Sequence, residues 1–296
     1  MVENIMSEPM PNSSDTRVNT QEIKQVVKDR YGKCAGTTSG ESCCCAGEAT
    51  ASMSFAAEHG LYSQEELSQI PEFARSLSKG CGNPTGFANL QPGEVVVDFG
   101  CGAGIDVILA ARKVGPSGKV FGVDFALQMI ERAGGAVAEA ALTDTVKLVV
   151  TDTEALDLPD GFADVVISNC VINLCPDKEA VYREAFRILK PGGRLAISDI
   201  VYSEKINAEV QEHFRSTWAG CVGGSIDQER YFEIVREAGF TQLEIVARHP
   251  LGSKELDEMA TCPGPEFTPA PAKDDLAMVQ EKVVSVKFKA IKPQHS

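Results

Sequence analysis

The middle of the chain alternates between two hydrophobic periods. From residue 94 onward, short runs rich in valine and isoleucine are followed by longer segments in which apolar residues recur at helical spacing. This alternation is typical of a parallel sheet covered by helices on both faces. The predicted strands are 94–99, 120–123, 146–150, 164–168 and 194–198. The predicted helices between them are 105–114, 127–140 and 178–189.

A second region follows residue 206. Its pattern predicts helices at 208–218 and 227–238, and then two strands at 243–247 and 283–290. A proline-rich insertion that contains Cys262 separates these two strands. We expect the two strands to close the sheet.

The front of the chain begins with a polar tail. Residues 1–18 carry no apolar period and are expected to be disordered. A helix capped by Asn19 or Thr20 is expected to end at Gly32. The small, cysteine-rich stretch 33–54 that follows is expected to be a loop.

A capping-box pattern marks the next element. Ser63 is followed three residues later by Glu66, which predicts a short helical region running towards Leu77. The chain then divides into a tail, a segment with one helix and a cysteine-rich loop, a sheet-forming domain and a C-terminal region. These four parts are 1–18, 19–93, 94–205 and 206–296.

Composition and charge reduce the classes of partner that the protein is expected to bind. The chain has 28 Lys and Arg against 42 Asp and Glu, a net charge of −14, and no basic cluster, so nucleic acid is not an expected partner. No apolar run approaches the ~18 residues of a membrane span, and the N-terminus lacks a secretion-signal pattern. We therefore expect a cytoplasmic protein without a membrane partner.

A glycine-rich turn follows the first predicted strand. The strand ends near Asp98, and the chain passes Gly100, Gly102 and Gly104 before the next helix, so the backbone can approach a ligand closely. Asp124 follows the second strand, 24 residues after Gly100, where a carboxylate would meet a ribose diol. This set favours a nucleoside-type cofactor, with a purely structural loop or an NAD enzyme as the alternatives.

Residues 94–200 resemble the class I S-adenosylmethionine-dependent methyltransferases, on this loop, Asp124, and the Asp-Thr-Glu sequence that ends the third strand. The resemblance implies an α/β Rossmann-like sheet, mostly parallel with an antiparallel last strand. It also implies S-adenosylmethionine as methyl donor, with no metal cofactor. The implied cofactor-binding residues are Asp98, Gly100, Gly102, Gly104, Asp124, Phe125, Thr153, Glu154 and Asn169.

Ten cysteines are more than packing requires in a chain expected to lie in a reducing compartment. Cys170 follows the fourth predicted strand, where the methyl acceptor should lie, while Cys81 and Cys221 lie in glycine-rich segments. Thiols around the acceptor end favour a soft, thiophilic acceptor. A structural zinc site is the competing interpretation, but paired C-x-x-C spacings are missing. Cys175 and Cys262 are interpreted as small apolar residues or surface bystanders.

The segment from Asn169 to Leu174, the Gly-Cys-Gly loop at Cys81 and the segment 218–224 resemble the arsenite methyltransferases, over about residues 22–245. This resemblance implies detoxifying methylation of arsenite, with trivalent arsenic bound by Cys81, Cys170 and Cys221. It also implies that one thiol of the run 43–45, taken as Cys45, is the redox partner of Cys81, with thioredoxin or glutathione as reductant.

Two other functions stay open at this point. One is a small-molecule C- or O-methyltransferase acting on a quinone or lipid, which would share the cofactor site but would not need Cys81, Cys170 and Cys221 together. The other is a thiol-rich protein that binds metalloids without turning them over. A methyl-transfer assay with arsenite separates these possibilities.

Overall fold

The computed structural model describes residues 20–36, 61–76, 80–207, 210–211, 221–253, 256 and 277–294. The predictions for the tail 1–18, the cysteine run 43–45, Cys262 and nearly all of the helix 208–218 lie outside the described residues. Within the described ranges, no helix is both long enough and apolar enough to cross a membrane.

The described residues form a seven-stranded sheet in the order β3-β2-β1-β4-β5-β7-β6. Strands β1 to β5 pair in parallel, and β7 runs antiparallel to both β5 and β6, which confirms the predicted mostly parallel sheet with an antiparallel last strand. The strands are β1 (Val95–Phe99), β2 (Lys119–Asp124), β3 (Val146–Val150), β4 (Ala163–Asn169), β5 (Leu189–Tyr202), β6 (Thr241–Pro250) and β7 (Val283–Ile291).

Strand β5 is longer than the predicted 194–198. Its first residue, Leu189, pairs with Ala163 of β4 before a register shift, and its last, Tyr202, pairs with Val283 of β7. The Lys-Pro-Gly-Gly sequence at 190–193 is typical of a turn, but in the structure it forms an irregular stretch of β5 with a shift in register.

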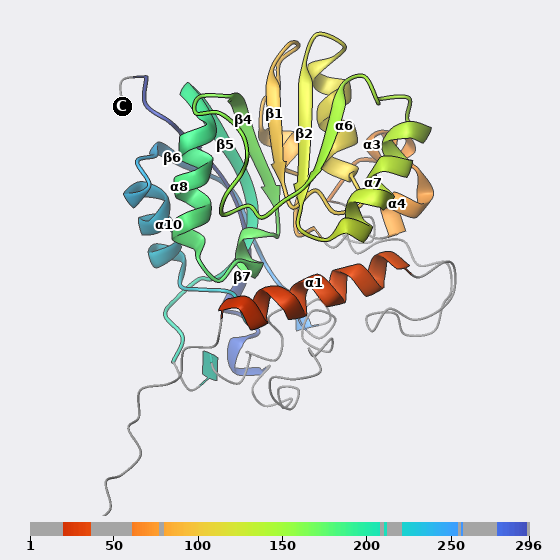
Figure 1. The fold of residues 1–296 in the computed structure, drawn as a ribbon. Coiled ribbons are helices and arrows are strands. Elements are labelled where there is room, and N and C mark those ends of the chain that lie inside the picture. The colour runs from red at the N-terminus through yellow and green to blue at the C-terminus, as the bar shows by residue number, and fades with distance from the viewer. Residues whose placement is uncertain are drawn as a thin grey trace, which may run out of the picture.

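Helices cover both faces of the sheet (Figure 1). Val97 and Phe99 of β1 pack on the same face as residues of α8 and α10, whereas Val96 packs on the opposite face with α6 and α7. Strands buried on both faces are nearly continuously apolar, which is why they are visible in the sequence. These helices are α6 (Ile105–Val114), α7 (Leu127–Glu139), α8 (Lys178–Ile188) and α10 (Gln228–Glu237).

The first helix, α1 (Thr20–Gly36), lies across the end of the sheet where the parallel strands terminate (Figure 1). The prediction that it ends at Gly32 is wrong. Gly32 packs against the side chain of Gln128 on α7, and the Arg132 side chain donates a hydrogen bond to the Ala35 carbonyl at 2.7 Å. Tertiary contacts therefore hold one more turn than the glycine alone suggests.

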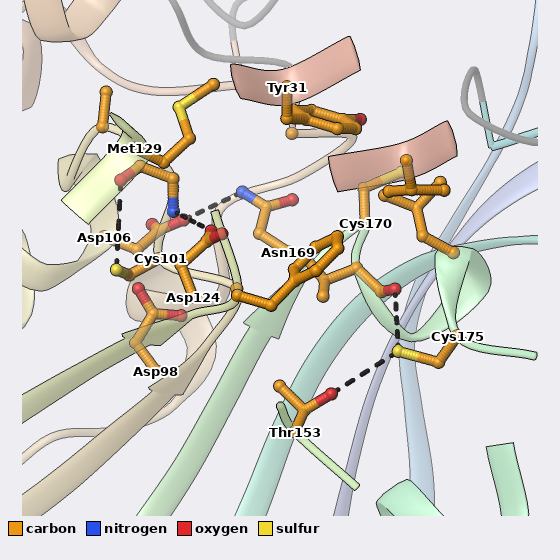
Figure 2. A pocket seen from close by; sticks show the side chains of 18 of the residues that line it. Tyr31, Asp98, Cys101, Asp106, Asp124, Met129, Thr153, Asn169, Cys170 and Cys175 are labelled. Atoms are coloured by element: carbon orange, nitrogen blue, oxygen red, sulfur yellow. Dashed lines mark hydrogen bonds between the residues drawn. The ribbon is translucent and has the colours of Figure 1, made fainter. Parts of the chain in front are cut away.

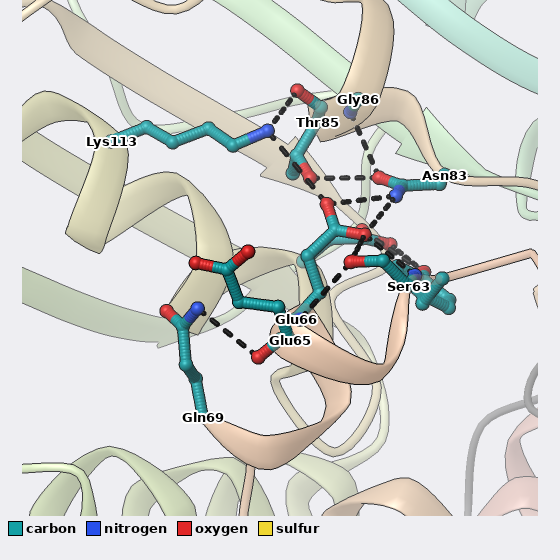
Figure 3. A network of polar contacts seen from close by, with 10 residues as sticks. Ser63, Glu65, Glu66, Gln69, Asn83, Thr85, Gly86 and Lys113 are labelled. Atoms are coloured by element: carbon teal, nitrogen blue, oxygen red, sulfur yellow. Dashed lines mark hydrogen bonds and ion pairs between the residues drawn. The ribbon is translucent and has the colours of Figure 1, made fainter.

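Short helices lead from α1 into the sheet: α3 (Gln64–Ser68), α4 (Glu72–Ser76) and α5 (Pro84–Phe87). The predicted capping box at Ser63 and Glu66 is present. The Glu66 carboxylate also accepts a hydrogen bond from Asn83 at 3.1 Å, as Figure 3 shows. Asn83 in turn caps α5, so this network fixes the chain just after Cys81.

Candidate functional site

A pocket of about 1050 Å³, counted out to its open mouth, lies at the carboxyl ends of β1, β2 and β4, beneath α1. Figure 2 shows its polar side chains: Asp98, Asp106 and Asp124 gather on one side, with Thr153 and Cys175 on the other. Open parallel sheets bind ligands at this edge. Among the predicted cofactor residues, those that line the pocket are Asp98, Gly100, Gly102, Asp124, Phe125, Thr153, Glu154 and Asn169.

Gly104 is the exception, since it does not line the pocket. It begins α6 with φ of +93°, and a side chain there would meet Ala133 of α7 at 3.3 Å. Its role in the structure is therefore close packing of α6 against α7.

The glycine-rich turn needs glycine for two reasons. Gly100 has φ of +71°, and a Cβ there would lie 2.3 Å from a methyl group of Val171. Gly102 has φ of +50° and donates its N–H to the Asp124 carboxylate at 3.0 Å. The turn is therefore tied to the end of β2 by the same aspartate that the sequence places at the ribose.

Asp124 is buried and well supported. Its second carboxylate oxygen accepts the N–H of Ala126 at 2.9 Å, and the first accepts that of Gly102. Burial raises the pKa of this carboxyl, and the backbone hydrogen bonds oppose that rise. The carboxylate is thus held in one orientation at the pocket wall.

Asp98 carries an unsatisfied group. Its side chain is 2% exposed, and one carboxylate oxygen has no hydrogen-bond partner among the described residues. Burial first, and then the nearby charges of Asp106 and Asp124, raise its pKa well above the usual value. A buried acceptor facing a pocket with two further carboxyl groups fits a cationic ligand, such as the ammonium and sulfonium of S-adenosylmethionine.

The far side of the pocket joins α1 to the end of β3. Lys24 of α1 forms ion pairs with Asp152 at 2.7 Å and Glu154 at 2.6 Å. Thr153 lies beside Cys175, with the hydroxyl and the sulfur 3.5 Å apart. Burial raises the pKa of the Cys175 thiol to about 12. Cys175 is therefore a half-buried part of the pocket wall that packs as a small apolar residue, not a surface bystander.

The three cysteines expected to bind arsenic come together although 140 positions separate the first from the last. They lie in one buried cluster, and the Cys221 thiol donates to the Cys170 carbonyl at 3.5 Å. The neighbouring thiols of Cys221 and Cys81, together with burial, raise the pKa of Cys170 well above its usual value. All three side chains are buried, and only Cys170 lines the cofactor pocket.

Two of these cysteines have strained backbones. Cys170 has φ of +62° and Cys221 has φ of +76°, in the left-handed region that side chains with a Cβ disfavour. Across the described ranges, no three His, Cys, Asp or Glu side chains form a ready-made cage for a metal ion. The three thiols therefore do not form a ready-made coordination site in this conformation of the described residues.

Two residues beside the site, Tyr62 and Asp106, escaped the sequence analysis, and Asn173 entered it only as part of the segment 169–174. Tyr62 donates its hydroxyl to the Asp106 carboxylate at 3.0 Å, and Asn169 donates to both of them. Burial raises the pKa of Asp106 to about 6. The position of Asp106, two residues after Gly104, is a signal that could have been used, whereas Tyr62 has none.

The chain matches the family model described as "Methyltransferase domain" over residues 90–239. It is 37% identical to an arsenite methyltransferase of Halobacterium salinarum over 81% of this chain and 63% of that protein. It is 30% identical to an arsenite methyltransferase of Rattus norvegicus over 67% of this chain and 56% of the relative. The match therefore spans less than two thirds of the length of either relative.

Solved structures give the same fold. An arsenic(III) S-adenosylmethionine methyltransferase from Chlamydomonas reinhardtii aligns over 82% of this chain and 76% of its own, with a TM-score of 0.60 and 26% identity. The family model covers more than half of the 296 residues, and it includes every strand from β1 to β5 and the glycine-rich turn. The chain therefore belongs to the methyltransferase-domain family.

Proposed function

We propose that this protein transfers methyl groups from S-adenosylmethionine to trivalent arsenic held by the thiolates of Cys81, Cys170 and Cys221. The observation that carries the proposal is the position of Cys170, which lies in one buried cluster with Cys81 and Cys221 and also lines the pocket that fits the cofactor. The similarity to arsenite methyltransferases supports the same acceptor.

The thiols bind arsenite by exchange. Three As–S bonds form, and each hydroxide on arsenic leaves as water with one thiol proton. The neighbouring thiols of Cys221 and Cys81, together with burial, raise the pKa of Cys170, so release of its proton has to accompany binding of arsenic. Soft sulfur ligands favour such a centre over hard cations.

The cofactor, when bound, supplies a methyl group on a sulfonium, which the lone pair of three-coordinate arsenic can attack. No side chain has to act as a general base. The contribution of Asp98 and Asp106 is electrostatic, because their carboxyl groups line the pocket that would receive the cationic end of the ligand, whereas Asp124 would hold the ribose. Holding both reactants in line can contribute about 7 to 11 kcal/mol in favourable cases.

Methyl transfer leaves arsenic pentavalent, and its return to the trivalent state takes two electrons. A pair of thiols can supply them by becoming a disulfide, and we assign Cys81 and Cys45 as that pair. Thioredoxin or glutathione then restores the thiols by exchange. Detoxification of arsenic is the corresponding physiological role.

The test is mass spectrometry of arsenic species after incubation with arsenite, S-adenosylmethionine and a thiol reductant. Wild-type protein should yield methylated arsenic, Cys170→Ser should yield none, and the control Cys262→Ser should match wild type. Arsenite binding without methylated product would instead indicate a metalloid-binding protein. Methylation unaffected by Cys170→Ser would exclude this thiol from the site.

A further inference from the structure

Two asparagines flank Cys170, and each reaches a loop that carries one of the other two thiols. Asn169 ends β4, and Asn173 lies in the short helix η1 (Ile172–Leu174). Asn169 contacts the loop of Cys81, and Asn173 contacts the loop of Cys221. One segment of five residues therefore presents a thiol and holds both of its neighbours.

Asn169 binds the Cys81 loop through both ends of its amide. Its oxygen accepts the Gly82 N–H at 3.1 Å, and its nitrogen donates to the Gly82 carbonyl at 2.8 Å. Gly80 lies so close that a Cβ there would be 2.3 Å from the Asn169 nitrogen. The loop is therefore seated directly on this side chain.

The orientation of Asn169 is fixed from the other side. Its amide nitrogen also donates to the Tyr62 hydroxyl at 2.9 Å and to the Asp106 carboxylate at 3.0 Å. Tyr62 and Asp106 accept only from the nitrogen end of the amide, so they exclude the flipped orientation. Asp106 and Asn169 both line the cofactor pocket, and the thiol loop is thereby connected to its wall.

Asn173 holds the Cys221 loop in a comparable way. Its side chain is fully buried, and its nitrogen donates to the Cys221 carbonyl and to the Ser225 hydroxyl, the latter at 3.0 Å. Ser225 donates to the same Cys221 carbonyl at 2.9 Å, which closes a small ring of hydrogen bonds. The buried Lys178 ammonium donates to the Asn173 carbonyl at 3.1 Å and fixes η1.

We infer that Asn169 and Asn173 are positioning residues that keep the loops of Cys81 and Cys221 beside Cys170, so that all three thiols can bind one arsenic atom. The inference rests on the proposed function. Rotation about a single side-chain torsion moves each sulfur, so the loops must already be in place for the three to converge. Neither asparagine has to touch the arsenic.

Two trivalent arsenicals that differ in their number of replaceable hydroxyls distinguish positioning of the loops from general stability. Arsenite has three replaceable hydroxyls and requires all three thiols. Phenylarsonous acid has two, because its As–C bond does not exchange, so it requires two thiols. Releasing one loop should weaken arsenite binding and spare phenylarsonous acid binding, whereas general destabilisation should weaken both.

The variants are Asn169→Asp and Asn173→Asp, which keep the shape of the side chain and remove the amide donor. Asn169→Ser and Asn173→Ser are the milder versions for use if a carboxylate prevents folding. The affinity for each arsenical is measured on reduced full-length protein by fluorescence of the single tryptophan, Trp218, which precedes Cys221 by three residues. The matched control is Tyr182→Phe, which removes one buried hydrogen bond to Tyr231 elsewhere in the core.

Asn169→Asp breaks the hydrogen bond to the Gly82 carbonyl, and Asn173→Asp breaks those to the Cys221 carbonyl and the Ser225 hydroxyl. Such losses correspond to about a tenfold loss of arsenite affinity. We expect this loss in each asparagine variant, with the affinity for phenylarsonous acid unchanged and Tyr182→Phe like wild type. An unchanged ratio of the two affinities in every folded asparagine variant would overturn the inference. Wild-type protein that fails to bind arsenite through three thiols would instead overturn the proposed function.

Discussion

The Lys24 ammonium lies 2.6 Å from the carboxylate of Glu154 and joins the first helix of the chain to the end of β3. Both side chains are largely shielded, with 22% and 16% of their surface exposed. Since Lys24 and Glu154 both line the pocket, and Glu154 is one of the residues expected to bind the cofactor, this ion pair holds α1 against the pocket. The helix therefore forms part of the pocket wall.

We predict that Lys24→Met accelerates release of the cofactor. Loss of a partly shielded ion pair costs about 0.5 to 1 kcal/mol, so dissociation of S-adenosylhomocysteine should be about two- to fivefold faster in stopped-flow measurements. The control is Lys28→Met, which removes an exposed charge from the same helix. Equal dissociation rates in the two variants would contradict a role for the ion pair.

Asp124→Ala should weaken cofactor binding about tenfold or more. The substitution removes the acceptor for the N–H groups of Gly102 and Ala126, together with the carboxylate expected at the ribose. Isothermal titration calorimetry with S-adenosylhomocysteine measures the effect, with the exposed Asp144→Ala as control. Calorimetry that gives the wild-type affinity for Asp124→Ala would remove this residue from the site.

Gly100→Ala should abolish cofactor binding in a folded protein. The new methyl group would meet Val171 at 2.3 Å in a backbone conformation with φ of +71°, and the left-handed conformation alone costs about 1 to 2 kcal/mol. A second substitution, Val171→Ala, should restore binding only in part, because it removes the clash and leaves the backbone strain. Full restoration would show that the left-handed conformation is dispensable.

The buried Asp199 should make stability depend on pH. Burial raises its folded-state pKa from 3.8 to about 6, with hydrogen bonding from Tyr231 and the charge of Lys178 opposing the rise. The protonated form is favoured in the folded state, so this stabilisation is complete below pH ~4 and is lost as the pH rises through 6. The full change amounts to about 3 kcal/mol.

Urea unfolding between pH 4.5 and 7.5 measures this effect. The free energy of unfolding of Asp199→Asn should lack the Asp199 part of the decline that wild-type protein shows over this range. Identical pH slopes in wild type and Asp199→Asn would mean that Asp199 is ionised in the folded protein throughout.

The sheet was predictable because the apolar period of each strand and helix is visible in its own local sequence. Helix α6 begins and ends where its apolar period does, and β3 matches its predicted range. The end of α1 was not predictable, because the contacts from Gln128 and Arg132 that extend it come from another helix. The local sequence of α1 contains no signal for contacts that a distant helix supplies.

The residues of the candidate site also fall into those that could be predicted from the sequence and those that could not. The glycine-rich turn and Asp124 are readable because ligand contact demands particular residue types at the ends of strands. The hydrogen bond from Asn169 to Tyr62 spans 107 positions, and that from Asn173 to Cys221 spans 48. A tyrosine or an asparagine fits many surroundings, so only the folded chain reveals these partners.

The position of α1 also bears on the proposed redox role of the run 43–45. The helix ends at Gly36, which is anchored near α7 by its neighbour Ala35, and the run 43–45 begins only seven residues later. Seven residues span at most about 25 Å when fully stretched. Helix α1, which lies against the pocket for the methyl donor, is thus also the anchor of the chain that leads to the proposed redox thiols. An insertion between Gly36 and the run 43–45 should slow repeated turnover without changing the first methyl transfer.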